Sequence, residues 1–199
     1  MCGIAGIMTA SGGPPDRNVL LAMQRALAHR GPDGEGRLSA DDVGMTQTRL
    51  AVIDLETGDQ PLFDTGGVAL VANGEIYNFV ELRDELAGEE FATASDCEPP
   101  IKLYRRDGLA FTDSLRGMYA LAIHDASARR LVLARDPFGI KHLYYAEGSF
   151  GFAFASEPQA LIAAGLVVPV LREAAMEQVL QLQFTTGAET AFAGIYRLL

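Results

Sequence analysis

The chain has 199 residues and a formal net charge of −10, from 16 Lys and Arg against 26 Asp and Glu. Hydrophobic residues make up 49% and charged residues 21%, which is typical of one folded domain and excludes a disordered chain. The negative charge opposes binding to nucleic acids and anionic lipid, and no apolar run is long enough to predict a membrane span.

In chain order, the first predicted element is a strand at 3–8, followed after a turn by a helix over about 16–28 that Asp16 caps. A glycine-rich loop at 29–34 ends this helix. Two further apolar runs predict strands, at 43–48 and 68–72.

Two more helices are predicted in the middle of the chain. Asn78 is expected to cap the first of them. Pro99 and Pro100 are expected in the first turn of the second, where proline is tolerated because the N–H groups of that turn have no helical partner. This helix is expected to end near Arg106, before Gly108.

The strongest strand signal consists of four runs rich in aromatic, β-branched and aliphatic residues, at 118–124, 130–135, 142–147 and 150–155. Their short links favour antiparallel pairing. A helix is expected at 172–183 and the start of a strand at 194–199, where the chain ends in an apolar segment that we interpret as the end of a piece of a longer protein. The sequence therefore predicts an α+β fold with antiparallel sheets in one domain, residues 1–199.

Cys2 is the first candidate for chemistry. A small residue at this position normally allows Met1 to be removed, which would leave a cysteine with a free α-amino group. That amine has a pKa of about 8, so it could accept the thiol proton, and one residue would supply both nucleophile and base. Taken alone, a cysteine at position 2 is better explained by chance.

The second cysteine, Cys97, is flanked by Asp96 and Glu98, which would raise the pKa of its thiol and weaken it as a nucleophile. Two cysteines are too few for a disulfide framework. Together with the absence of a signal peptide, they predict a protein of the reducing cytoplasm.

The segment 73–78, Asn-Gly-Glu-Ile-Tyr-Asn, follows an apolar run. An Asn side-chain amide beside a Gly backbone N–H can place two donors at one point, which an amide hydrolase needs for its tetrahedral oxyanion. Taken alone, Asn73 and Gly74 are better explained as an ordinary strand-to-helix turn.

Three charged residues could bind the two ends of an α-amino acid. Arg49 can clamp a carboxylate with two hydrogen bonds, and Asp96 or Glu75 can hold an ammonium group. For each residue a surface ion pair is the alternative, and the sequence leaves it open. Neither a phosphate-binding loop nor a metal-ligand spacing is found.

Six motifs occur along the chain, at 2–6 (Cys-Gly-Ile-Ala-Gly), 29–34 (His-Arg-Gly-Pro-Asp-Gly), 49–54 (Arg-Leu-Ala-Val-Ile-Asp), 73–78, 95–98 (Ser-Asp-Cys-Glu) and 135–141 (Arg-Asp-Pro-Phe-Gly-Ile-Lys). In this order they resemble the glutaminase domain of glutamine-hydrolysing asparagine synthetases, a class II glutamine amidotransferase domain. The resemblance covers nearly the whole chain. The sequence departs from the family pattern at Pro99, Pro100, His142 and Pro158.

This resemblance implies an N-terminal-nucleophile hydrolase fold, which is a four-layer αββα sandwich of two antiparallel sheets. It implies that Cys2 is the nucleophile, that Asn73 and Gly74 form the oxyanion hole, and that L-glutamine is hydrolysed to glutamate and ammonia through a cysteine thioester. Arg49 would bind the carboxylate of glutamine and Asp96, with Glu75, its ammonium group. The residues implied to contact glutamine are Arg49, Val52, Ile53, Asn73, Gly74, Glu75 and Asp96.

The resemblance also implies a partner, a synthetase domain that uses ATP and Mg²⁺ and receives the ammonia. That domain is absent from these residues, within which no cofactor or metal is expected, and a homodimer is compatible with the family. Two alternatives stay open: a non-catalytic glutamine-binding or scaffold module, and an amide hydrolase acting on another substrate. Against the first counts the intact set of Cys2, Arg49, Asn73, Gly74, Glu75 and Asp96, since a sensor could lose Cys2. In the second, Arg49 with Asp96 favours a free α-amino acid over a peptide.

Overall fold

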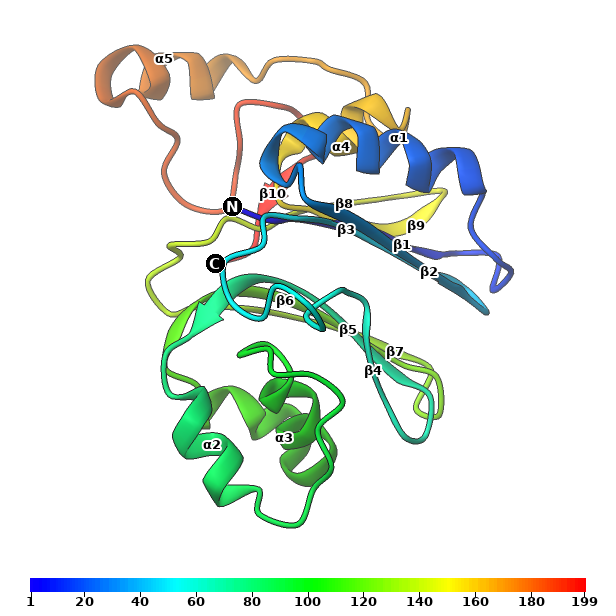
Figure 1. Ribbon diagram of the computed structural model, residues 1–199. Helices are drawn as coiled ribbons and strands as arrows, with labels where there is room; N and C mark the ends of the chain where they lie inside the picture. Colours follow the sequence, from blue (N-terminus) through cyan, green and yellow to red (C-terminus); the bar gives the residue numbers. More distant parts are fainter.

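Two antiparallel sheets lie face to face at the centre of the molecule, with helices on both outer sides (Figure 1). The structure is a computed structural model that describes all residues 1–199. One sheet has six strands in the order β10-β8-β9-β1-β3-β2, and the other has four in the order β4-β5-β6-β7. This arrangement is the αββα sandwich of antiparallel sheets that the sequence and its resemblance predict.

The six-stranded sheet contains β1 (Gly3–Thr9), β2 (Gly34–Ala40), β3 (Val43–Arg49), β8 (Tyr144–Gly148), β9 (Gly151–Ala155) and β10 (Tyr196–Arg197). The four-stranded sheet contains β4 (Leu62–Asp64), β5 (Val68–Ile76), β6 (Gly117–Asp125) and β7 (Arg130–Arg135). In the first sheet β1 pairs with both β3 and β9. Cys2 therefore lies at the entrance to a central strand, whose position is fixed from both sides.

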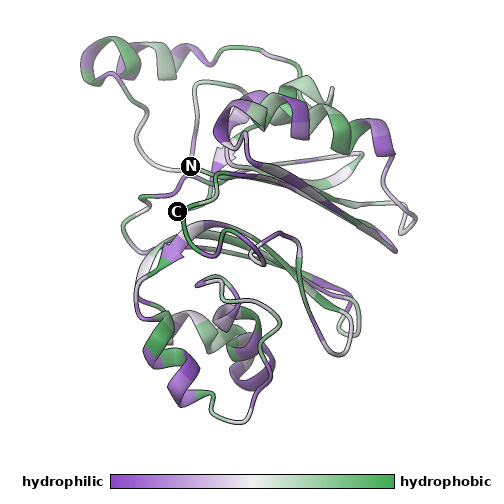
Figure 2. Cartoon of the chain, viewed as in Figure 1, coloured by the Kyte–Doolittle hydropathy of each residue, from purple (hydrophilic) through white to green (hydrophobic).

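The helices form the two outer layers (Figure 1). The six-stranded sheet is covered by α1 (Arg17–Leu27) and α4 (Pro158–Ala163), and the four-stranded sheet by α2 (Phe79–Glu85) and α3 (Pro99–Asp107). A further helix, α5 (Glu173–Leu182), extends away from the sheets, and short 3-10 turns span 28–30 and 108–114. In Figure 2, α1 and α2 carry both purple and green segments, as expected for helices with one buried face.

Three buried clusters fill the spaces between the four layers. One lies between α1, α4 and the six-stranded sheet, and a second lies between α2, α3 and the four-stranded sheet. The third, the inner cluster, joins the two sheets and consists of Ile4, Val43, Met45, Ala69, Val71, Ala120, Ala122, Leu143 and Phe154. Central strands such as β5 thus bury both faces, which explains why residues 68–72 are apolar without alternation.

The strands and helices predicted in chain order are present, with ends shifted by a few residues in most cases. Asp16 caps α1 as predicted, and its Oδ1 accepts a hydrogen bond from Asn18 N at 2.8 Å. Asn78 is the N-cap residue of α2 as predicted, and its carbonyl accepts the first hydrogen bond of the helix from Leu82 N, but its side chain makes no capping hydrogen bond. Its Nδ2 donates to Ser114 O and its Oδ1 accepts from Arg116 N, both at 2.9 Å, so Asn78 joins α2 to the entrance of β6.

The sequence missed β2, β4 and α4, and it ended β5 too early. The segment 73–76 continues β5 because it pairs with β6, with Gly74 opposite Tyr119. β2 was also missed because its glycines weaken the strand pattern. A Cβ on Gly36 would lie 1.6 Å from Gln60 O, so glycine is required there by the close approach of another segment and not by a turn.

Gly6 provides a test of how closely the layers pack. A Cβ at this position would lie 2.5 Å from Phe154 Cε1 and 2.6 Å from Gly44 O. We expect Gly6→Ala to lower the free energy of unfolding by about 1–3 kcal/mol, the usual cost of overpacking a core. Gly13→Ala is the matched control, because a Cβ there meets only Ser11 Oγ, at 3.7 Å. Urea unfolding compares the two variants, and equal stabilities would show that β1 and β9 leave room for a methyl group.

Candidate functional site

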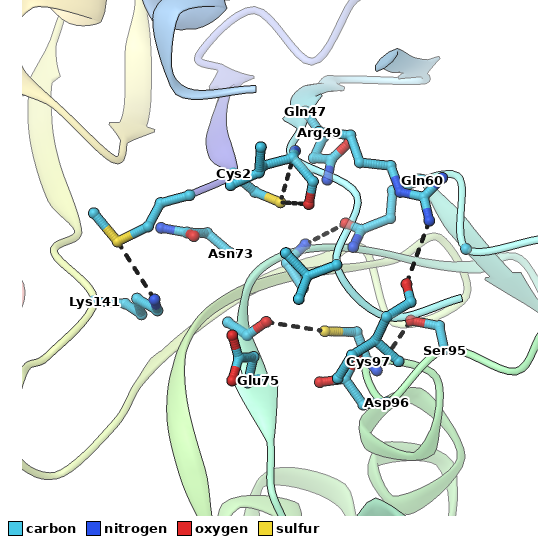
Figure 3. A pocket seen from close by; sticks show the side chains of 17 residues that line it. Cys2, Gln47, Arg49, Gln60, Asn73, Glu75, Ser95, Asp96, Cys97 and Lys141 are labelled. Atoms are coloured by element: carbon cyan, nitrogen blue, oxygen red, sulfur yellow. Dashed lines mark hydrogen bonds between the residues drawn. The ribbon is translucent and has the colours of Figure 1, made fainter. Parts of the chain in front are cut away.

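A cavity of about 100 Å³ opens between the two sheets where β1 begins (Figure 3). Its walls come from segments far apart in the sequence: the start of β1, the ends of β3 and β5, the loop after β3 and the segment before α3. Every residue that the sequence proposed for the site lines this cavity, namely Cys2, Arg49, Val52, Ile53, Asn73, Gly74, Glu75 and Asp96. The fold therefore brings the candidate residues of both sheets to one place.

Cys2 is held through both its thiol and its backbone. Its Sγ lies 3.4 Å from Leu50 N and 3.6 Å from Leu50 O. Arg30 Nε donates to Cys2 O at 2.9 Å, and Arg30 Nη1 donates to Glu157 Oε1 at 2.5 Å. Burial alone would raise the pKa of Glu157, but hydrogen bonds from Arg30 and His29 lower it below its ordinary value. The ionised Glu157 thus anchors the arginine that positions Cys2.

Asn73 carries a buried donor without an acceptor. The residue is 1% exposed, and its Nδ2 has no hydrogen-bond partner. In Figure 3 its amide lies between Cys2 and the side chain of Lys141. An unsatisfied buried donor costs about 1–3 kcal/mol, so a ligand oxygen that accepts this hydrogen bond would be strongly favoured. Asn73 is therefore suited to stabilise an oxygen that becomes negative during a reaction.

The backbone N–H of Gly74 also faces the cavity side of β5. The N–H groups of Ala72 and Ile76 donate to Gln60 Oε1 and Asp96 Oδ2, at 2.6 and 2.7 Å, on the edge of β5 opposite β6. Because backbone N–H groups alternate between the two edges of a strand, the N–H of Gly74 lies on that same edge. A Cβ on Gly74 would lie 2.5 Å from Met118 O, so only glycine fits here.

Arg49 is buried and organises the loop that follows β3. Its guanidinium donates to the carbonyl oxygens of Ile53 and Asp54, and Nη1 lies 2.7 Å from Asp59 Oδ1. The side chain of Asp59 is 82% exposed, so this ion pair is weak and its carboxylate can exchange for another. The same loop brings Val52 to the cavity wall.

Asp96 is a buried carboxylate that faces no cation. Its Oδ2 accepts the hydrogen bond from Ile76 N, and no ion pair involves it. Burial raises the pKa of Asp96, and the nearby carboxylate of Glu75 raises it further. An ammonium group bound here would supply the missing positive charge.

Cys97 is a poor nucleophile, as the sequence predicts. Burial is the main cause that raises the pKa of its thiol well above the ordinary value, and Asp96 adds to the effect. Its Sγ lies 3.9 Å from Gly74 O. Pro99 and Pro100 form the first turn of α3 and leave Asp96 at the cavity.

The cavity also contains residues that the sequence did not single out for the site, including Met1, Gln47, Gln60 and Lys141. Gln47 is 1% exposed and its Nε2 has no hydrogen-bond partner. A signal for Gln47 was present, because residues two apart on a strand share a face and Arg49 follows two positions later. Gln60 could not be found in this way, since it acts through a contact with the distant Ala72.

Two further observations concern the whole chain. No group of three or more His, Cys, Asp or Glu side chains is arranged to hold a metal ion. None of the helices has the length and apolar character needed to cross a membrane.

Comparison with known proteins shows what this chain is similar to. It matches the family described as a glutamine amidotransferase domain over residues 1–199. Asparagine synthetase [glutamine-hydrolyzing] 2 of Bacillus subtilis (strain 168) is 39% identical over 165 residues, which is 81% of this chain and 22% of that protein. Amidase chry2 of Gibberella zeae is 35% identical over 213 residues, which is 100% of this chain and 31% of that protein. The chain thus spans less than a third of these relatives.

Among solved structures, the glutamine phosphoribosylpyrophosphate amidotransferase from B. subtilis, complexed with ADP and GMP, has a similar fold. The TM-score is 0.68 with 24% identity, over 82% of this chain and 44% of that chain. The αββα sandwich, the family match over residues 1–199 and the related sequences all indicate the same family. The chain belongs to the glutamine amidotransferase domain family, has the N-terminal-nucleophile fold and is homologous to the glutaminase domains of glutamine-hydrolysing asparagine synthetases.

Proposed function

We propose that this chain hydrolyses the side-chain amide of L-glutamine to glutamate and ammonia, with Cys2 as the nucleophile after Met1 is removed. The observation that carries the proposal is the buried Asn73 Nδ2 without an acceptor, in a cavity that also holds a cysteine thiol. Such a pair is what acyl transfer through a thioester requires.

The proposed reaction uses three residues of the cavity, Cys2, Asn73 and Gly74. The α-amine of Cys2 takes the thiol proton, and Sγ forms a bond to the amide carbon of glutamine. The carbonyl oxygen becomes an oxyanion, which accepts hydrogen bonds from Asn73 Nδ2 and Gly74 N. Collapse breaks the C–N bond, and the α-ammonium returns the proton to the departing ammonia. Water then hydrolyses the thioester, which releases glutamate and restores the thiol.

The charges of the cavity support an amino acid as the substrate. Arg49 would exchange its exposed partner Asp59 for the substrate carboxylate. Asp96, with Glu75, would bind the α-ammonium group, which relieves the repulsion between these two acids. A substrate with both charges on one carbon fits this pair of contacts better than a residue within a peptide.

We also propose that the ammonia passes to an ATP-dependent synthetase, in the same polypeptide or in a separate subunit, that converts aspartate to asparagine in the cytoplasm. The support is that relatives named asparagine synthetases match this chain over only 22–32% of their length. ATP and Mg²⁺ would bind to that other part, because these residues contain neither a phosphate-binding loop nor a cluster of metal ligands.

A second function is supported by a specific comparison. A relative named an amidase matches 100% of this chain. The chain could therefore hydrolyse an amide other than glutamine, with the same nucleophile. Rates of ammonia release from glutamine, asparagine and N-acylated amides separate the two functions, since only the first requires a preference for free glutamine.

The nucleophile is tested by intact-protein mass spectrometry with the glutamine-like electrophile 6-diazo-5-oxonorleucine. We expect loss of Met1 and one adduct, mapped to Cys2, with Cys97 unmodified as the internal control because its thiol is buried and protonated. Cys2→Ala should form no adduct and release no ammonia from glutamine. A processed Cys2 that takes no adduct would support the non-catalytic binding module instead.

The oxyanion donor is tested by steady-state kinetics of Asn73→Ala. Loss of one such donor typically lowers kcat by about 10²–10³, and KM should change little because the donor acts mainly in the transition state. Arg49→Ala provides the contrast, since it should raise the KM for glutamine more than it lowers kcat. A raised KM with a normal kcat in Asn73→Ala would exclude this role of the amide.

The ammonium site predicts a pH-dependent affinity. The ionised form of Asp96 binds an ammonium group, and its raised pKa means that protonation begins at higher pH than for an ordinary aspartate. Glutamine should therefore bind tightly near neutral pH and weaken as the pH falls through this raised value. Calorimetry on Cys2→Ala measures the affinity without turnover. Asp96→Asn should bind weakly at every pH, and a pH profile equal to that of the parent would contradict the assignment.

A further inference from the structure

Lys141 is a buried lysine that has no role in the reaction proposed above. It lies in the loop between β7 and β8, is 6% exposed, and lines the cavity together with Met1 and Cys2. Its Nζ lies 3.5 Å from Met1 Sδ (Figure 3) and forms no ion pair with a carboxylate. A buried ammonium without an acidic partner is costly, so a purely structural role explains it poorly.

The backbone around Lys141 is fixed, so its side chain is directed into the cavity. Lys141 N donates to Asp136 Oδ2 at 3.0 Å, and Arg135 Nε donates to Lys141 O at 2.9 Å. The carboxylate of Asp136 also accepts hydrogen bonds from the N–H groups of Tyr119, Phe138 and Ile140. Asp136 is thus engaged by the backbone of its own loop and of β6, and it makes no ion pair with the ammonium of Lys141.

Arginine side chains contact the backbone of both Cys2 and Lys141. Arg30 binds the carbonyl group of Cys2, and Arg135 lies 3.4 Å from Nδ1 of His142, the residue after Lys141. Burial lowers the pKa of His142, and Arg135, Arg197 and Arg30 lower it further, while Asp136 opposes them. The other charged or titratable groups of the cavity are Arg49, Glu75, Asp96 and Cys97. In Figure 3, Asp96 and Cys97 lie across the cavity from Lys141.

We propose that, once Met1 has been removed, the ammonium of Lys141 lowers the proton affinity of the α-amino group of Cys2. This inference rests on the proposed function. Met1 is bonded to the nitrogen that becomes this amine, and its side chain touches Lys141, so the new amine and the lysine share the part of the cavity that Met1 fills. Repulsion between like charges keeps the amine neutral at physiological pH. The amine can then accept the thiol proton and later return it to ammonia. Lys141 is a positioning residue that acts through Cys2.

The α-amine is titrated directly in a variant that cannot turn over. The 199-residue chain carries Cys2→Ser and is produced with a leader that a site-specific protease removes in front of residue 2. The rate of acetylation by limiting acetic anhydride is followed against pH by peptide mass spectrometry. In this Cys2→Ser background, the protein with Lys141 is compared with its Lys141→Met and Lys141→Arg variants. Lys141→Met should raise the pKa of the amine by about one unit, the usual effect of one charged neighbour, and Lys141→Arg should not.

The matched control is Lys102→Met, which removes the only other lysine of the chain. Lys102 pairs with Asp64 on the far side of the four-stranded sheet, and Arg105 also binds that carboxylate. This variant should leave the pKa of the amine unchanged, so it separates a local effect from the loss of one charge anywhere. Thermal unfolding verifies that each variant is folded. An equal amine pKa in folded Lys141→Met and its parent would overturn the inference.

Kinetics with Cys2 present separate this inference from the proposed function. In Lys141→Met, the acidic limb of the kcat profile for glutamine should move to higher pH by the same shift, with KM unchanged and with recovery in Lys141→Arg. An active parent with an identical profile in Lys141→Met would overturn the role of Lys141 alone. A parent that hydrolyses no glutamine at any pH, while its amine titrates with the expected shift, would overturn the glutaminase function and leave the charge effect standing.

Discussion

The contact between the two sheets is the constraint on which the site depends. Cys2 enters the cavity from the six-stranded sheet, whereas Asn73 and Gly74 come from the four-stranded sheet. Between the sheets lie several small side chains, including Ala69, Ala120 and Ala122, which allow the two backbones to approach closely. A displacement of about 1 Å between reacting groups can cost roughly 10²-fold in rate, so the inner cluster sets catalytic geometry as well as stability.

The sequence predicted those elements whose local pattern agrees with their place in the fold. The capped helix α1 and the strands of the second half are examples, because their periodicity and turns are local properties. It failed where a distant segment decides the outcome. Residues 73–76 resemble a turn but extend β5 through pairing with β6, and the glycines of β2 serve a close approach to Gln60.

In the candidate site too, local patterns were informative only in part, and contacts between distant segments decided the rest. Composition and spacing established no candidate by itself: a cysteine at position 2 was better explained by chance, and a surface ion pair stayed open as the alternative for Arg49. Their order along the chain, compared with a known family, assembled them into one set, and the cavity contains that whole set. Lys141 belonged to a recognised motif. Its proposed effect on the amine of Cys2, however, depends on its contact with Met1 at the N-terminus, 140 positions earlier, which no local pattern encodes.

The short length of β4 has a consequence for recognition. It pairs with β5 only as far as Leu70, so beyond that point one edge of β5 has no neighbouring strand. Side chains of Gln60 and Asp96 occupy two of its N–H groups, and the N–H of Gly74 lies between them. An amide carbonyl at this point would accept the hydrogen bond that an adjacent strand accepts elsewhere. The substrate would then occupy the position of an adjacent strand at this edge of β5. Because the donor is a backbone N–H of the protein, side-chain substitutions at the site would leave this contact in place.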